Sequence, residues 1–157
     1  MIQDIFKHKK QGKIVGFTCS SFDLCHAGHC AMLAEAKTHC DILVIGLQTN
    51  PTVDRPSKNL PVQTVFERWV QIQAIKEVDF VVPYETEQEL QDMLLTILPH
   101  KRIIGEEYQG KPFTGHDIEH IEHVYNSRRH SFSSSSLRRR MAEQEITELT
   151  KELGDKK

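Results

Sequence analysis

The sequence predicts one α/β domain, built on a single doubly wound parallel sheet of about five strands with helices on both faces. Short continuous apolar runs, such as ILVIGL at 42–47, are typical of strands that both faces of a parallel sheet bury. Segments of helical periodicity alternate with these runs, the order that right-handed crossover connections produce. The chain has 157 residues, which suits one domain with a substantial core.

Two of the expected strands lie in the first quarter to third of the chain. Residues 1–12 are polar and predict a short helix or arm, and the apolar, β-branched residues 13–19 predict the first strand. A turn-rich loop then leads into a helix at 29–37, and 42–47 predict the second strand. Residues 48–61 form a polar loop with three prolines, long enough to be functional.

The rest of the chain repeats the alternation. Thr64 is the expected N-cap of a helix that places Phe66, Trp69 and Val70 on one side. The expected elements are a helix at 64–77, a strand at 80–82, a helix at 86–98, strands at 102–104 and 123–125, a short helix at 117–122, and a last helix capped by serines 133–136. We place the functional domain at 13–141, between an N-terminal arm (1–12) and a C-terminal helical tail (142–157).

Composition excludes several classes of protein. The formal net charge is −2, so no global field attracts the chain to nucleic acid or to an anionic membrane, and we expect neither partner. No apolar run reaches the length of a membrane span. The four cysteines lie within one quarter of the chain, which indicates reduced thiols and a cytoplasmic protein rather than a disulfide scaffold.

The segment His26-Ala27-Gly28-His29 carries the strongest chemical signal. It follows the first predicted strand and opens a helix, so the two histidines project from one face. The helix start offers free backbone N–H groups and partial positive charge, and Gly28 permits close approach of a phosphate. Without a nucleophile–base pair of the hydrolase type, positioning and electrostatics would stabilise a phosphoryl transition state.

Several motifs in order resemble the cytidylyltransferase-like nucleotidyltransferase superfamily over residues 13–141. The family's G-T-F-D-x-x-H-x-G-H corresponds here to residues 20–29. The later landmarks are Ala36-Lys37 before Cys40-Asp41, Glu67-Arg68 before Val78-Asp79, Gly105-Glu106-Glu107-Tyr108, Arg128, and Phe132-Ser133-Ser134-Ser135. The pattern is most similar to the glycerol-3-phosphate cytidylyltransferases, with the heptose-phosphate nucleotidyltransferases second. The resemblance implies a Rossmann-like fold.

The resemblance also implies roles for particular residues. Catalytic contacts with the transferring phosphate and its neighbours would come from His26, His29, Lys58 and Arg128. The nucleotide would contact Ser21, Phe22, Ala27, Gly28, Arg68, Gly105, Glu106, Tyr108, Ser133, Ser134 and Ser135. The acceptor would meet Arg55 and Glu85. A nucleoside triphosphate, CTP by preference, would enter with Mg²⁺ held mostly by phosphate oxygens. No protein-held metal site is expected, and the enzyme is expected to form a homodimer.

Alternatives remain open at this point. The first enzymatic interpretation that the resemblance implies is transfer of a nucleoside monophosphate, CMP by preference, from a nucleoside triphosphate to a polyol, sugar or amino-alcohol phosphate, with release of pyrophosphate. Adenylyl transfer to a heptose phosphate or to flavin mononucleotide is the second. Ser20 replaces the family's glycine and Glu85 stands where glycerol-phosphate enzymes have a lysine, so a catalytically silent nucleotide-binding regulatory module is the alternative of another class. A metal protein built on Cys25, His26, His29 and Cys30 is the weakest reading. Arg138, Arg139 and Arg140 are expected to form a solvated helix face beside an anionic site.

Overall fold

The computed structural model describes residues 1–127 and 130–154. The strands are β1 (Val15–Ser20), β2 (Ile42–Gln48), β3 (Phe80–Tyr84), β4 (Lys101–Gly105) and β5 (Glu122–Asn126). The helices are α1 (Ile2–Lys10), α2 (Ala27–Lys37), α3 (Val65–Gln73), α4 (Glu87–Ile97) and α5 (Ser134–Gly154), and η1 (Glu106–Tyr108) is a 3₁₀ turn.

The five strands form one parallel sheet in the order β3-β2-β1-β4-β5. The chain winds outward from β1 to β3, then returns to place β4 on the other side of β1. The strand order therefore reverses between β1 and β4, and this switch point is where doubly wound sheets bind ligands. The predicted fold class is confirmed, with strand bounds that differ from expectation by no more than two residues.

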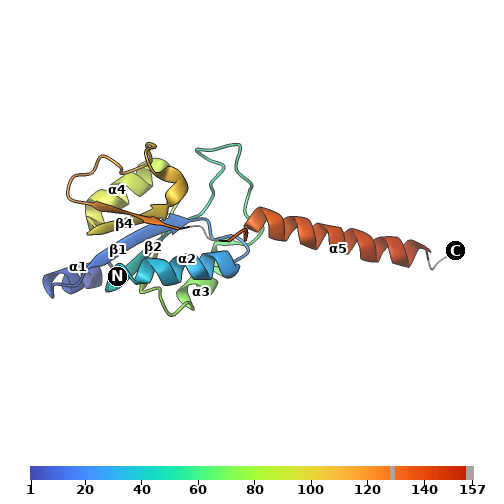
Figure 1. Ribbon diagram of the computed structural model, residues 1–157, viewed down its shortest axis with the longest axis horizontal. Coiled ribbons are helices and arrows are strands. Elements are labelled where there is room, and N and C mark those ends of the chain that lie inside the picture. The colour runs from blue at the N-terminus through green and yellow to red at the C-terminus, as the bar shows by residue number, and fades with distance from the viewer. Residues whose placement is uncertain (128–129, 155–157) are drawn as a thin grey trace.

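Two apolar clusters cover the two faces of the sheet. On one face, Leu33 of α2 and Ile72 of α3 pack against side chains of β2 and β4. On the other, Ile5 of α1 and Leu94 of α4 pack against β1 and β2. Figure 1 shows α4 on one side of the sheet and α2 with α3 on the other. Every residue of β2 is buried, which explains its continuous apolar sequence.

The two ends of the chain differ in how they contact this core. Ile5 anchors α1, and the Lys9 ammonium donates to the carbonyl oxygens of Ile97 (3.0 Å) and Leu98 (2.7 Å) at the end of α4. By contrast, α5 projects away from the sheet (Figure 1) and contains no buried residue. The helix runs without a break through the expected boundary at 141/142.

Two local expectations are wrong. Residues 117–121 form turns and irregular backbone rather than a short helix, and Glu122 already belongs to β5. Gly115 (φ +81°) and His120 (φ +67°) adopt left-handed backbone conformations that interrupt a helix. In α3, which ends at Gln73 rather than at 77, the buried residues are Arg68 and Ile72, whereas Phe66 is 71% exposed. None of the helices among residues 1–127 and 130–154 has the length and apolar character needed to cross a bilayer.

Candidate active site

A cleft of about 700 Å³ opens at the carboxyl ends of the strands. Its walls include the ends of β1 and β4, the start of α2, the loop after β2 and the start of α5. Eleven of the residues that the sequence predicted line this cleft: Ser21, His26, Gly28, His29, Arg55, Lys58, Gly105, Tyr108, Ser133, Ser134 and Ser135. Segments more than 100 residues apart in sequence, around His26 and Ser134, thus meet at one site.

The start of α2 fixes the tautomers of both histidines. His26 is the N-cap, and its Nδ1 accepts a hydrogen bond from the Gly28 backbone N–H (3.1 Å). Nδ1 of His29 accepts from the His26 backbone N–H (3.4 Å), and the two rings stack with centroids 4.0 Å apart. Because each Nδ1 is an acceptor, the proton of a neutral ring lies on Nε2, where it can be donated to a phosphate oxygen.

Burial keeps His29 neutral. Desolvation, reinforced by the neighbouring His26, lowers the pKa of His29 to about 4. At neutral pH this ring is therefore an uncharged donor. Burial, together with the adjacent Cys30 thiol, raises the pKa of Cys25 to about 11, so this cysteine remains a thiol and is a poor nucleophile or metal ligand.

Gly28 is required for packing at the helix start. A Cβ at this position would lie 2.7 Å from Cε1 of His130 and 2.9 Å from Cε1 of His26. The His130 ring therefore covers the glycine, and the sequence did not predict this third histidine at the site. His130 also stacks on Phe132, with ring centroids 5.1 Å apart.

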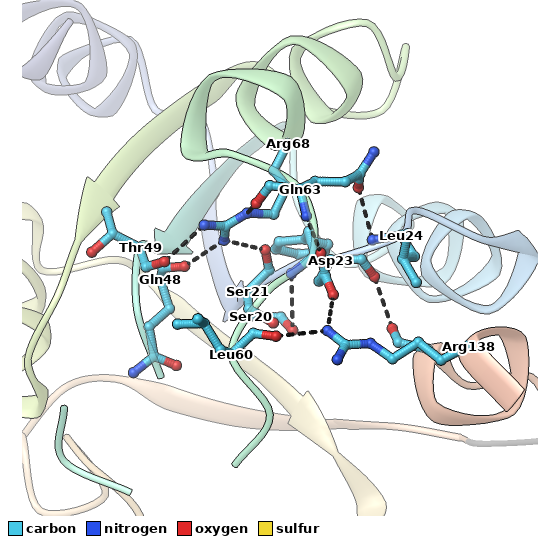
Figure 2. A network of polar contacts seen from close by, with 12 residues as sticks. Ser20, Ser21, Asp23, Leu24, Gln48, Thr49, Leu60, Gln63, Arg68 and Arg138 are labelled. Atoms are coloured by element: carbon cyan, nitrogen blue, oxygen red, sulfur yellow. Dashed lines mark hydrogen bonds and ion pairs between the residues drawn. The ribbon is translucent and has the colours of Figure 1, made fainter. Parts of the chain in front are cut away.

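The loop after β1 is joined to the start of α5 through Asp23 (Figure 2). Asp23 is 4% exposed, and its carboxylate accepts hydrogen bonds from Arg138 and from the Gln63 backbone N–H (3.0 Å). Burial raises the pKa of Asp23, but hydrogen bonds from Gln63, Arg138 and Val62 outweigh that effect and hold the pKa below its usual value. The Ser134 hydroxyl donates to the Asp23 carbonyl (2.8 Å). Arg138, expected in solvent, is therefore part of the site.

Arg68 is buried behind the cleft and donates hydrogen bonds to the backbone of the loops that form its wall (Figure 2). It is 1% exposed, and its guanidinium donates to the carbonyl oxygens of Ser21, Gln48 and Thr49, each at 2.7 Å. A fourth bond reaches the Gln63 carbonyl (3.2 Å). These bonds join the loops after β1 and β2, so Arg68 positions the site rather than lining it.

The loop after β2 brings two cations to the cleft. Lys58 is exposed there, and its backbone N–H closes a turn on the Arg55 carbonyl (2.9 Å). Arg55 donates to Gln48 Oε1 (2.9 Å) and pairs with Glu87 Oε1 (3.1 Å). The partner of Arg55, Glu87, lines the cleft, whereas Glu85 is exposed and lies outside it.

Some predicted site residues lie elsewhere. Four further predicted nucleotide contacts do not line the cleft: Phe22, Ala27, Arg68 and Glu106. Phe22 is fully buried at a left-handed φ of 50°, and its ring packs 5.3 Å from that of His29. Arg128 lies outside the described residues. Polar residues that the sequence analysis did not select also line the cleft: Asp23, Gln48, Tyr84, Glu87, Arg102, Glu107, Asn126, Ser127, His130 and Arg138.

The arrangement suits transfer of a phosphoryl-linked group. Imidazole donors line one wall, serine hydroxyls at the start of a long helix line another, and a lysine and an arginine extend into the cleft from a loop. Such groups stabilise charge that develops on phosphate oxygens. The fold and the cleft define an α/β nucleotidyltransferase.

Comparison with known proteins identifies the family of the chain. Residues 17–140 match the model of the family described as cytidylyltransferase-like, and the chain belongs to that family. The bifunctional protein HldE of Sulfurimonas denitrificans is 36% identical over 112 residues, covering 69% of this chain and 23% of that protein. HldE of Granulibacter bethesdensis is 32% identical over 113 residues, covering 71% and 23%. The chain thus spans under a quarter of the length of these relatives.

Solved structures share the fold. A lipopolysaccharide core biosynthesis protein from Thermoplasma volcanium superimposes with a TM-score of 0.56 at 20% identity, covering 73% of this chain and 98% of that one. Pantothenate synthetase from Thermus thermophilus gives a TM-score of 0.50 at 14% identity, covering 81% and 60%. At these identities the likeness concerns the architecture alone.

Proposed function

We propose that the enzyme transfers a nucleoside monophosphate from a nucleoside triphosphate to a phosphorylated small molecule, a polyol, sugar or amino-alcohol phosphate, and releases pyrophosphate. The observation that carries this proposal is the pair of stacked histidines at the capped start of α2, of which the buried His29 is neutral. Their Nδ1 atoms are both acceptors, which leaves Nε2–H groups for an anion beside the serines of α5.

In the proposed reaction an oxygen of the acceptor phosphate attacks the α-phosphorus. A new P–O bond forms on one side, while the bond from the α-phosphorus to the bridging oxygen breaks on the other, and its electron pair leaves with pyrophosphate. His26 and His29 donate to the α-phosphate oxygens as charge accumulates there. Lys58, Ser133, Ser134 and Ser135, with Arg128 in the proposed set, would bind the β- and γ-phosphates.

Mg²⁺ is the proposed cofactor. Among the described residues no cluster of three or more His, Cys, Asp or Glu side chains could hold a metal ion. The cleft does present oxygen donors, the serine hydroxyls and Glu107, which are the ligands that Mg²⁺ accepts alongside phosphate oxygens. A triphosphate-bound ion therefore fits, and it would neutralise charge on the leaving pyrophosphate.

Two candidate reactions differ in the triphosphate and in the acceptor that they use. The glycerol-phosphate pattern of motifs favours CTP, but Glu85 lies outside the cleft and so gives no information on the acceptor. The likeness to HldE proteins makes adenylyl transfer to a heptose phosphate the second candidate. We further propose a cytoplasmic homodimer, supported by the four free thiols and by the apolar side chains that α5 exposes.

A substrate matrix tests the proposal. The four common triphosphates with Mg²⁺ are combined with glycerol 3-phosphate, heptose and hexose 1-phosphates, phosphoethanolamine and flavin mononucleotide, and pyrophosphate release is measured. One pair should release pyrophosphate and yield a product whose mass equals acceptor plus nucleoside monophosphate less water. Triphosphate binding by calorimetry without turnover of any pair would instead identify a silent nucleotide-binding module.

A further inference from the structure

Arg102 is a buried cation in the middle of the molecule. It lies on β4, directly across from Phe17 of β1, and is 4% exposed. Its guanidinium carbon is 5.3 Å from the centroid of the Phe17 ring, and Nη2 donates to the Cys19 thiol at 3.5 Å. Nε and Nη1 are buried and have no hydrogen-bond partner within the described part of the chain.

Arg102 forms no salt bridge among residues 1–127 and 130–154. Arginine does not lose its proton in proteins, so the guanidinium cannot become neutral. Glu87 is the nearby carboxylate, but it pairs with Arg55 (3.1 Å) and accepts from the Thr114 hydroxyl. His123, the β5 neighbour of Arg102, is held neutral because burial and then the Arg102 charge lower its pKa. An unpaired buried charge is costly, so an anionic ligand at this position would be strongly favoured.

The surrounding wall offers further donors. Nε2 of Gln48 is buried and has no partner among residues 1–127 and 130–154. Tyr84 keeps its phenolic proton, because burial and the adjacent Cys19 raise its pKa. Arg102, Gln48 and Tyr84 all line the cleft, so its deep part is rich in donors. Such a site fits an oxyanion with neighbouring hydroxyl groups.

The position of Arg102 separates it from the nucleotide-binding groups. The Phe17 contact places Arg102 on the side of the sheet that α1 and α4 cover, whereas His26 and His29 stand at the start of α2, which covers the opposite side. Both sides of the cleft meet at the switch point between β1 and β4. Two substrates can therefore enter from opposite sides of the sheet and meet beyond the strand ends.

We propose that Arg102 binds the phosphate of the acceptor and thereby determines where the acceptor lies, deep in the cleft on the α1/α4 side. This inference rests on the proposed function, which supplies a phosphorylated acceptor. Gln48 and Tyr84 donate to oxygens of the same molecule. Arg102 is then a residue that binds the attacking substrate, and the acceptor is selected for negative charge at this depth.

Inorganic phosphate serves as the binding probe. Its affinity is measured by calorimetry in the wild type, in Arg102→Leu and in Arg102→Lys, at constant ionic strength. Lys101→Leu is the matched control, because Lys101 precedes Arg102 on β4, pairs with Glu122 (3.7 Å) and does not line the cleft. Loss of a charge-assisted contact predicts at least about tenfold weaker phosphate binding in Arg102→Leu, partial recovery in Arg102→Lys and no change in the control.

Steady-state kinetics identify which of the two substrates Arg102 binds. With a turned-over pair from the substrate matrix, Arg102→Leu should raise KM for the acceptor at least about tenfold and leave KM for the triphosphate unchanged. The inference would be overturned if Arg102→Leu raised only the KM for the triphosphate, or if it bound phosphate as tightly as the wild type does. It would also be overturned if the wild type bound malonate, a dicarboxylate, in place of phosphate. If no pair is turned over, the proposed function fails, while phosphate binding still decides the role of Arg102. Should Arg102→Leu not fold, Arg102→Gln takes its place.

Discussion

At the start of α2, Nδ1 of each imidazole accepts a hydrogen bond from a backbone N–H, so in both rings Nε2 is the nitrogen left to contact a ligand in the cleft. We expect His29→Ala to reduce the rate of transfer by about 10²–10³-fold while triphosphate binding persists, because the lost donor acts mainly on transition-state charge. Steady-state kinetics and calorimetry on the folded variant measure both quantities. Cys30→Ser, on the same turn but outside the cleft, should retain wild-type kinetics. Equal rates in wild type and His29→Ala would remove the histidine from the mechanism.

The depressed pKa of His29 also makes stability depend on pH. The ring binds a proton near pH 6.5 in the unfolded chain but only near pH 4 in the folded one, so between these values the unfolded state holds more protons. Stability from this group is therefore fully present above about pH 6.5 and declines as the pH falls toward 4. Urea unfolding at pH 7 and pH 5 should show a smaller loss in His29→Gln than in the wild type. An identical loss in both proteins would contradict the buried, neutral state.

The predicted residues that line the cleft belong mostly to short motifs, whereas the contacts between distant segments were not predicted. His26, His29 and the serines at 133–135 were found because each group is contiguous and stands at a helix start. Asp23 and Arg138 are 115 positions apart, and Arg102 and Cys19 are 83 apart. Nothing local distinguishes such an arginine from a solvated one. Only the folded sheet shows which charges are buried.

At the scale of elements, the first turn of α5 is attached to the site and the rest of the helix is not. Arg138 donates to the buried Asp23 carboxylate and to the Leu60 carbonyl (2.9 Å), which joins three segments. Arg138→Ala would leave Asp23 buried without this partner, and we expect a loss of about 1–3 kcal/mol in the free energy of unfolding. Triphosphate affinity should also fall, because Ser133–135 lose their position.

Urea unfolding and calorimetry measure these two effects. Arg139→Ala is the control, because Arg139 is exposed on the same helix turn. If both variants behave alike, the contact with Asp23 does not hold the start of α5. The Asp23 contribution should also be lost in acid, since a carboxylate with a depressed pKa stabilises the fold above its unfolded pKa and stops doing so as the pH falls through the folded value.

Periodicity predicted the elements better than it predicted their buried faces. The apolar run at 42–47 left little choice, and β2 is buried throughout. In α3 the apolar stripe that includes Phe66 and Val70 faces outward, while Arg68 is turned inward by four backbone carbonyl groups. Carbonyl groups at loop ends do not show in a hydrophobic pattern, so spacing alone does not predict that Arg68 is buried.

At the scale of the whole molecule, the reversal of strand order between β1 and β4 brings side chains from the two faces of the sheet to one cleft. The α2 side contributes the histidines, and the α1/α4 side contributes Arg102. The binding loops lie at one end of the sheet because all strands are parallel and their carboxyl ends coincide. Conversely, α5 extends beyond this compact part (Figure 1), and the fold buries none of its side chains.

We expect the exposed apolar side chains of α5 to form the interface of the proposed homodimer. Ile146, Leu149 and Leu153 recur at spacings that place them on one side of the helix, and they are 64%, 50% and 69% exposed. Contiguous apolar surface of this kind marks an interaction site. The wild type should therefore migrate as a dimer in light scattering coupled to gel filtration, and Ile146→Asp with Leu149→Asp should shift it to a monomer. Gln144→Asp adds one carboxylate, where the double variant adds two, on the opposite side of the helix, and it should leave the dimer intact. A wild type that is monomeric across a dilution series, or a double variant that stays dimeric, would show that α5 does not hold two copies together.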